Sequence, residues 1–372
     1  MNNELISKQI QERGKISAFQ LTLLIITLVL ATADVLLPAF VAQEAKQDSW
    51  ISVIIGTVSA LPIINLFLTL GLKYPDKTIV QYTCDILGKF FGKIVGFLYI
   101  YFFIFITSAV VRELEEIFVV SFNSDIPISL ISIIIVLVAM YSLYGGLEVI
   151  TRVNDVLLPL GIFVLLFVGF TNIPQMDLHH FLPVLYDGLI PPLKGGLLIL
   201  TWLLKSIVLL QLIPFVKDKK RIRKNIFIGT IALGNGLLIG VFTIAIFGPI
   251  TEKLLFPALE YVRFARFGHY IENLDISIML VWIGGIFINI AVYYYAAVLG
   301  LAQLFNLDSY KPMLTPVGVL IVCFSILIAK TLPEIIYFVH YIYPFYIFTI
   351  AFIIPALLLF VSMAKESQNS LH

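Results

Sequence analysis

Residues 16–41 read ISAFQLTLLIITLVLATADVLLPAFV, an apolar run with a single charged residue, Asp34. A helix that crosses the hydrocarbon core of a bilayer needs about 20 predominantly apolar residues. The run is too long for the hydrophobic part of a cleavable signal, and no small-residue cleavage site follows it. We therefore predict that it forms the first membrane-spanning helix.

The rest of the chain has the same character. Of its 372 residues, 60% are hydrophobic and 13% are charged, and the mean hydropathy is +1.01. A soluble domain carries about 25% charged residues, which it needs to cover its surface. We predict an all-α integral membrane protein with one bundle over residues 16–363, between a cytoplasmic segment 1–15 and a cytoplasmic tail 364–372.

Short polar connections separate ten apolar runs of spanning length. Several runs exceed 20 residues, which implies tilt or bends. The predicted helices are 16–41, 50–72, 93–120, 127–145, 155–172, 192–216, 224–247, 274–304, 315–331 and 335–363.

The distribution of lysine and arginine predicts the orientation. With the N-terminus in the cytoplasm, the inner segments hold 16 of these cations and the outer segments hold 7. Because cytoplasmic loops carry the excess of positive charge, both termini are expected inside. Six inner cations cluster in residues 217–224. They either set the topology or also bind anionic lipid headgroups.

Two outer segments also have expected roles. Residues 248–273 are aromatic and long, which predicts a short helix that lies in the interface or caps the bundle. Glu113, Glu115 and Glu116 fall where the third helix leaves the membrane, so we expect a solvated helix end.

The sequence offers no catalytic, metal or cofactor site. Cys84 and Cys323 are its only cysteines, and His179 and His180 are adjacent, which is poor spacing for metal ligands. Walker loops, GxSxG, HExxH and dinucleotide fingerprints are absent. We predict that the protein is not an enzyme and does not bind nucleic acid.

Polar groups inside a bilayer are costly and therefore indicate function. Asp34 lies in the first helix, and Pro38 crowds the carbonyl of Asp34 and removes one helical hydrogen bond. The segment is either an unwound ligand-binding stretch or a kinked helix whose acid reaches the outer interface.

Lys205 lies near the middle of the sixth helix, within TWLLKS at residues 201–206. An ammonium group at this depth needs an acidic partner or a water-filled cavity. It either takes part in function or forms a buried structural pair between helices. Gly195 and Gly196 before it and Pro214 after it favour a local irregularity.

The third and eighth helices carry aromatic and amide side chains at central positions. These either line a ligand cavity or pack within the bundle. Together with the residues around Asp34 and Lys205 they form the predicted ligand-binding set: Thr32, Ala33, Asp34, Tyr99, Tyr101, Thr201, Leu204, Lys205, Ser206, Asn289 and Tyr293.

Five short stretches resemble the spore-germination permease family, the integral B subunits of nutrient germinant receptors, within the amino acid–polyamine–cation superfamily. They are ISAFQ at 16–20, QDSWISV at 47–53, YPDKT at 74–78, GKFFGK at 88–93 and GGLEVITR at 145–152. The resemblance runs over nearly the whole chain.

The resemblance implies a five-plus-five inverted repeat with discontinuous first and sixth helices around a ligand at the midplane. It implies a nutrient sensor, for an amino acid, in the inner spore membrane, with an A-type membrane subunit and a C-type lipoprotein as partners. The alternative is a secondary amino-acid transporter coupled to protons or sodium.

The chain departs from its relatives at both irregular helices. Ala31 and Ala33 stand where relatives often have glycine, and relatives often have an acid near Lys205. Because two unpaired charges in a membrane are costly, we also predict that Asp34 and Lys205 interact, directly or through ligand or water, within about 10 Å.

Overall fold

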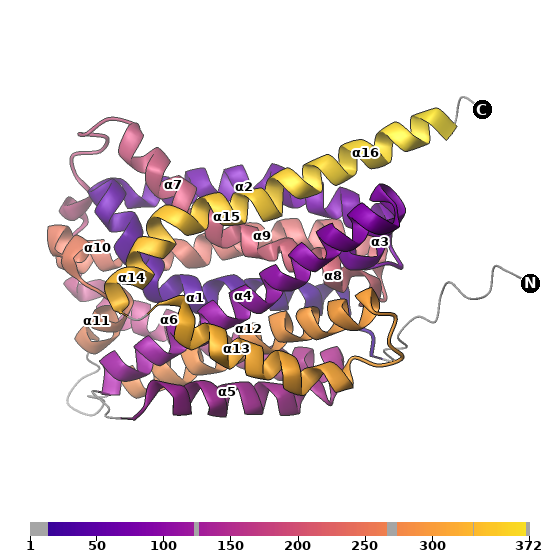
Figure 1. Cartoon of the computed structure of the whole chain (residues 1–372). Coiled ribbons are helices and arrows are strands. Elements are labelled where there is room, and N and C mark those ends of the chain that lie inside the picture. Colours follow the sequence, from indigo (N-terminus) through magenta and orange to yellow (C-terminus); the bar gives the residue numbers. More distant parts are fainter. Residues whose placement is uncertain (1–13, 123–125, 266–273, 330, 370–372) are drawn as a thin grey trace, which may run out of the picture.

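The computed structural model describes residues 14–122, 126–265, 274–329 and 331–369, and these ranges form helices without a β-strand (Figure 1). The crossing helices are α1 (Ala18–Ala45), α2 (Ser49–Lys73), α4 (Lys89–Phe122), α5 (Ile128–Leu143), α6 (Gly146–Asn172), α7 (Ile190–Leu203) with η4 (Leu204–Val208), α8 (Leu209–Leu212) and η5 (Ile213–Phe215), α9 (Lys219–Val241) with α10 (Thr243–Phe247), α12 (Leu274–Leu304), α13 (Leu314–Ile328), and α14 (Leu332–Tyr337) with η8 (Phe338–Ile342), α15 (Tyr343–Phe348), η9 (Thr349–Ile353) and α16 (Ile354–Asn369).

The ten predicted spanning helices are all present. The described residues contain eight helical stretches that are long and apolar enough to cross a membrane. The first of these, Ala18–Lys73, contains both α1 and α2, which are joined by the short turn η1 (Lys46–Asp48). Counting α1 and α2 separately, the eight stretches give nine crossing helices, and the shorter apolar helix Ile128–Leu143 is the tenth.

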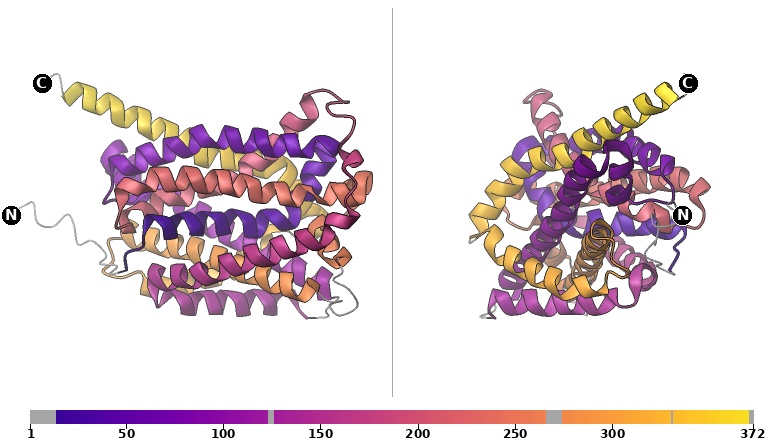
Figure 2. Two further views of the ribbon diagram at one scale, coloured as in Figure 1. Left: turned by 180° about the vertical axis from the view of Figure 1, so that it is seen from behind. Right: turned by 45° about the vertical axis from the view of Figure 1, so that its right-hand side comes forward.

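Helix α1 lies at the centre of the bundle, between α7, α9, α6 and α12 (Figures 1 and 2). A capping box starts it, because Ser17 Oγ accepts from the Gln20 amide at 3.1 Å and Gln20 Oε1 accepts from the Ser17 amide at 2.9 Å. Residues 27–42 are all buried, as expected for a helix that is apolar on every side.

The outer helices have the opposite pattern. On α5 and α13, Ile134, Leu137, Val319 and Leu327 expose between 51% and 72% of their surface. Such large exposed apolar side chains suit contact with lipid.

Both ends of the described chain lie at the same end of the bundle (Figure 1). Asp218 Oδ1 accepts from the Ala18 amide at 2.7 Å, at the start of α1. On the same end, Lys219 pairs with Asp76 at 2.5 Å and Lys73 pairs with Glu366 at 3.0 Å. The basic cluster therefore lies at the same end of the bundle as the start of α1 and the end of α16. An even number of crossings requires that these two helix ends lie on the same side.

The sixth crossing segment is discontinuous, as predicted. Between α7 and α8 the backbone changes to the 3₁₀ turn η4, and a second 3₁₀ turn, η5, ends the segment. A stretch of 3₁₀ helix in the middle of a spanning segment marks a site of strain or function.

The first helix differs from the prediction, because α1 runs without a break from Ala18 to Ala45 despite Pro38. Ala31 and Ala33 account for this continuity. Alanine is the strongest helix former, whereas glycine at these positions would favour unwinding.

The outer segment caps the bundle. It forms η6 (Gly248–Lys253) and α11 (Pro257–Phe264), which buries Leu259, Tyr261 and Val262 against α1, α6 and α12. The aromatic residues Phe267 and Tyr270 of the predicted segment lie outside the described residues.

Candidate functional site

The break in the sixth segment places Lys205 inside the bundle. Lys205 is 5% exposed, and its Nζ atom donates to Thr32 Oγ1 on α1 at 2.9 Å. Nζ also lies 5.2 Å from the ring centre of Trp202, within range of a cation–π interaction. The structure therefore brings together two predicted residues from different helices, Thr32 and Lys205.

Tyr293 on α12 completes this contact. Its hydroxyl donates to the backbone carbonyl of Lys205 at 2.5 Å. The 3₁₀ geometry of η4 leaves carbonyls without their usual helical partners, and Tyr293 satisfies one of them. The eighth crossing helix thus stabilises the break itself.

The other predicted residues of this segment have local roles. Thr201 Oγ1 donates to the Leu198 carbonyl and Ser206 Oγ donates to the Leu203 carbonyl, each at 2.7 Å. Leu204 is fully buried. Back-bonding of this kind bends helices and occupies the hydroxyl proton, so these side chains shape the break.

Glu113 on α4 lies within electrostatic range of Lys205, although no direct ion pair joins these two described residues. The expected solvated end at Glu113, Glu115 and Glu116 is therefore wrong. Glu115 is fully buried and accepts from Arg112 at 3.0 Å, while Glu116 pairs with Arg112 at 2.5 Å. Because Arg112 compensates the charges of these two acids, this part of α4 can lie inside the bundle.

Several buried polar atoms next to Lys205 and Glu113 have no hydrogen-bond partner among the described residues. They are Glu113 Oε1, Trp202 Nε1 and Tyr343 OH. Trp202 and Tyr343 pack edge to face, with ring centres 5.9 Å apart, and Tyr343 also interacts with Glu113. Unsatisfied buried polar groups are costly, so a cluster of them indicates a place where water or a ligand binds.

The two tyrosines predicted on the third helix separate. Tyr99 is buried and donates to the Ile350 carbonyl of the last segment at 3.2 Å. Tyr101 is 42% exposed and stacks on Phe105, so it lies on the outer face of α4. Tyr101 is not brought to the cluster around Lys205.

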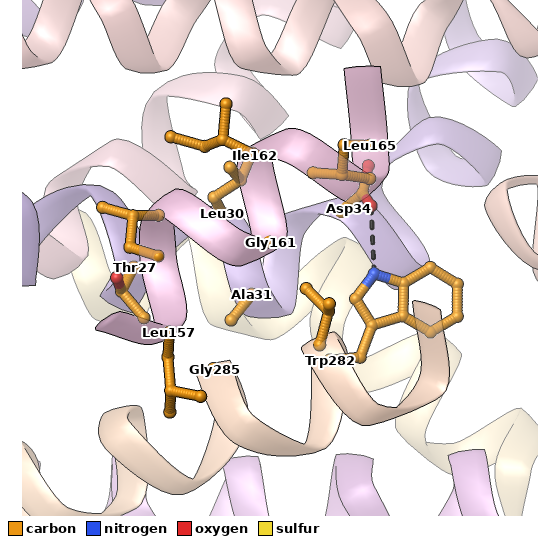
Figure 3. Close-up of a pocket in the computed structure, with 12 residues that line it drawn as sticks. Thr27, Leu30, Ala31, Asp34, Leu157, Gly161, Ile162, Leu165, Trp282 and Gly285 are labelled. Carbon is orange, nitrogen blue, oxygen red and sulfur yellow. Dashed lines mark hydrogen bonds between the residues drawn. The ribbon is translucent and has the colours of Figure 1, made fainter. Parts of the chain in front are cut away.

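Asp34 borders a different space. A small pocket lies between α1, α6 and α12, and its lining includes Thr27, Asp34, Gly161 and Trp282 (Figure 3). Trp282 Nε1 donates to Asp34 Oδ2 at 3.0 Å. Together with Ala33, Asp34 also borders a second, smaller cavity toward α2, α7 and α9. A single carboxyl group thus lies between cavities on two sides of α1.

Asn289 fixes α12 to α1. Its Nδ2 atom donates to the Leu28 carbonyl at 2.6 Å, and its Oδ1 atom has no described partner. The preceding residue of α1 is Thr27, whose Oγ1 atom donates to Asn154 Oδ1 of α6 at 2.6 Å. These contacts hold the inner wall of the cavity that Asp34 borders.

Asp34 and Lys205, both among the described residues, form no direct ion pair. Each has a separate partner: Asp34 binds Trp282, and Lys205 binds Thr32 and interacts with Glu113. An interaction of the two through ligand or water stays a prediction. No group of three potential metal ligands occurs in the described part of the chain.

Sequence reasoning missed Glu113, Trp202, Trp282 and Tyr343 as site residues. A signal existed for Glu113, because Arg112, Glu115 and Glu116 have the spacing of ion pairs on one helix face. Glu113 lies about 100° around the helix from Arg112, on another face.

Comparison with known proteins agrees with this architecture. A family model described as spore germination protein matches residues 15–333. The chain is 27% identical to spore germination protein YndE of Bacillus subtilis (strain 168) over 82% of this chain and 85% of that protein. It is also 27% identical to spore germination protein KB of the same organism, over 87% of each chain.

The solved structure of MhsT in complex with L-phenylalanine has the same fold. The TM-score is 0.70 at 13% sequence identity, and the match covers 94% of this chain and 99% of MhsT. The predicted class, an all-α transporter-like bundle, is thereby confirmed, whereas the predicted break in the first helix is absent.

Proposed function

Because the chain belongs to the spore germination protein family, we propose that it is a membrane subunit of a germinant receptor that binds a small nutrient inside its helical bundle. The nutrient is an amino acid. The protein lies in the inner spore membrane with both termini in the cytoplasm, and it signals to an A-type membrane subunit and a C-type lipoprotein.

The cluster around Lys205 carries this proposal. The buried ammonium group of Lys205 lies at the break in the sixth segment, in contact with α1 and α12. The unsatisfied Trp202 Nε1 and Tyr343 OH lie beside it. A zwitterion satisfies such groups better than an apolar molecule does. That MhsT was solved with L-phenylalanine supports an amino acid as the kind of ligand.

Sensing requires that the ligand bind two conformations with different affinity. The broken segment offers a place for this difference, because its 3₁₀ turn holds Lys205 while α1 stays continuous. Ligand that binds Lys205 and Thr32 together would favour one arrangement of the two helices.

The second candidate function is secondary transport of an amino acid. Asp34 favours it, because a buried carboxyl group between two cavities is placed to bind a coupled proton or cation. The fold supports both functions, so the fold alone does not choose between them.

The test uses the purified full-length protein with and without its companion subunits. Ligand-dependent thermal shift with the twenty L-amino acids measures binding, since a ligand of the folded state raises the midpoint. Uptake of the radiolabelled ligand into vesicles that contain this protein alone would favour transport. Binding without uptake, and loss of germination in spores that lack either companion, would support sensing. Absence of any amino-acid binding would overturn both functions.

A further inference from the structure

The basic cluster, residues 217–224, contains six cations, and most of them have no acidic partner. Lys219 pairs with Asp76, and Arg223 donates to the neutral amide oxygen of Asn65 on α2. The side chains of the other four cations are exposed and form no ion pair with any described residue. They are Lys217, Lys220, Arg221 and Lys224.

Topology alone does not require this lack of compensation. On neighbouring elements at the same end of the bundle, Lys77 pairs with Asp85 at 2.7 Å. Likewise, Arg152 pairs with Glu148 at 2.6 Å. The orientation of a membrane protein depends on its cations and little on nearby acids, so paired cations would serve it equally well. On α9, like charges three and four residues apart repel each other. The exposed cluster therefore favours an anion from outside the chain.

The exposed face of α9 changes from basic to apolar along the helix. Helix α9 packs on α1 and α2, and the view from behind shows it on the outside of the bundle (Figure 2). Lys224, Ile228 and Ile231 have the spacing of one helix face, and the two isoleucines expose 56% and 53% of their surface. Ile231 lies about 10 Å beyond Lys224 along the helix axis. The face thus presents cations first and lipid-exposed apolar side chains directly after them.

We propose that this face of α9 binds an anionic phospholipid, with the phosphate on Arg221 and Lys224 and an acyl chain along Ile228 and Ile231. The remaining exposed cations of the cluster add to the attraction of the anionic headgroup. The site is separate from the cluster around Lys205, so it does not rest on the nutrient-binding function.

A phospholipid suits this face better than free phosphate or an acidic segment of a partner protein. Free phosphate or an acidic segment would contact only the cations. A phospholipid contacts the cations and the isoleucines together, because its charge is joined to apolar chains. A cation close to an anionic membrane surface strengthens binding by about fivefold, so two such cations are enough to select an anionic over a zwitterionic lipid.

The test measures which lipid lies beside α9. The full-length protein is reconstituted in vesicles of equal parts phosphatidylglycerol and phosphatidylcholine, and one lipid at a time carries brominated chains, which quench tryptophan fluorescence. Ile228→Trp places the reporter on the proposed face, and the unsubstituted protein gives the background of its three native tryptophans. We expect brominated phosphatidylglycerol to quench this reporter with a preference of at least about fivefold over brominated phosphatidylcholine.

Two controls accompany the reporter. Ile134→Trp is the matched position, since Ile134 is 54% exposed and lies in the half of α5 away from the basic cluster, and it should show no preference. In the Ile228→Trp protein, Arg221→Gln together with Lys224→Gln should reduce the preference to that of the matched position. Lys77→Gln removes a charge at the same end of the bundle but not on α9, and it should leave the preference unchanged.

Each outcome decides. Equal quenching of the Ile228→Trp reporter by the two lipids would overturn the lipid site and leave the cluster to topology or to an acidic protein partner. A preference that survives the loss of Arg221 and Lys224 would also overturn it. If the variants do not fold, the wild-type protein in detergent decides, because a ligand of the folded state raises the thermal midpoint. Phosphatidylglycerol should raise the midpoint more than phosphatidylcholine does, and an equal rise would overturn the proposal.

Discussion

Lys205 Nζ donates a hydrogen bond to Thr32 Oγ1 at 2.9 Å, and this contact joins the break in the sixth segment to the continuous helix α1. The two partners differ in backbone character. Thr32 lies in the middle of an uninterrupted α-helix, whereas Lys205 lies in a 3₁₀ turn. A change in the hydrogen bonding of the turn therefore moves Lys205 relative to a fixed point.

The first prediction concerns this hydrogen bond. Thr32→Val keeps the shape of the side chain and removes the acceptor, so the buried ammonium group loses its direct partner. We expect a destabilisation of about 1–3 kcal/mol, measured as a lower thermal midpoint of the detergent-purified protein. Thr32→Ser keeps the hydroxyl and should cost less. Equal midpoints for Thr32→Val and the wild type would show that the hydrogen bond contributes nothing.

The second prediction concerns the two acids that could compensate Lys205. A double-mutant cycle with Lys205→Met and Glu113→Gln should give a coupling free energy of about 0.5–3 kcal/mol, because each single change leaves one charge uncompensated. A second cycle, with Lys205→Met and Asp34→Asn, is the comparison. Its coupling free energy measures any interaction of Asp34 with Lys205 through ligand or water. Additive effects in the Glu113 cycle would refute the electrostatic partnership.

The third prediction concerns Asp34 and Trp282. Trp282→Phe removes the indole N–H that donates to the carboxyl group at 3.0 Å, and it leaves a buried acceptor unsatisfied. We expect a loss of about 1–3 kcal/mol in unfolding free energy. Asp34→Asn keeps an acceptor oxygen and should lower the unfolding free energy less than Trp282→Phe does.

Asp34 also has an expected effect on transport. If the protein transports an amino acid, Asp34→Asn should abolish proton- or sodium-driven accumulation of that amino acid in vesicles while exchange continues. Unchanged accumulation would exclude Asp34 from coupling.

The apolar runs predicted the crossing helices well because the bilayer imposes one requirement, a length of apolar helix. The same physics identified Lys205, since a lone cation in an apolar segment must have a reason. The irregularity of the sixth segment was also readable, because Gly195, Gly196 and Pro214 flank the lysine.

The missed features depend on tertiary partners. Glu113 was assigned to a solvated end because it falls, with Glu115 and Glu116, where the third helix was predicted to leave the membrane. The structure pairs two of them with Arg112 and leaves Glu113 within electrostatic range of Lys205, which is 92 positions away. Pairings of that separation leave no local trace in a single sequence. The continuity of α1 is by contrast a local property, because Ala31 and Ala33 favour a helix and α1 continues through Pro38.

The fourth prediction concerns the close approach of α2 and α7. A methyl group added at Gly56 would lie 2.5 Å from Ile199 Cβ and 2.8 Å from the Gly196 carbonyl oxygen. Small residues let helices in membranes pack this closely. Gly56→Ala should therefore cost about 1–3 kcal/mol. Gly169→Ala on α6 is the control, since the nearest atom, Tyr261 OH, would be 4.0 Å away. An equal thermal midpoint for both variants would contradict the tight contact.

The fifth prediction tests the orientation through Cys84. Cys84 lies on the short helix α3 (Ile79–Leu87), which packs on α4 and α16 at the end that carries the basic cluster. If that end is cytoplasmic, a membrane-impermeant maleimide should label Cys84 in inverted vesicles and not in intact cells. The test protein carries Cys323→Ser. Lys46→Cys, placed on the opposite end in a cysteine-free background, should show the reverse pattern.

The rate of this labelling has its own expected pH dependence. Burial raises the pKa of the Cys84 thiol above 9.0, and the neighbouring Asp85 raises it further. Because the thiolate is the reactive form, a raised pKa means less thiolate near neutral pH and slower reaction. Lys77→Cys, on the same end and 52% exposed as lysine, should react faster at pH 7. The difference should narrow as the pH rises through the two pKa values. Labelling of Cys84 faster than that of Lys77→Cys at pH 7 would contradict the burial of Cys84. Labelling of Cys84 from outside intact cells would contradict the orientation.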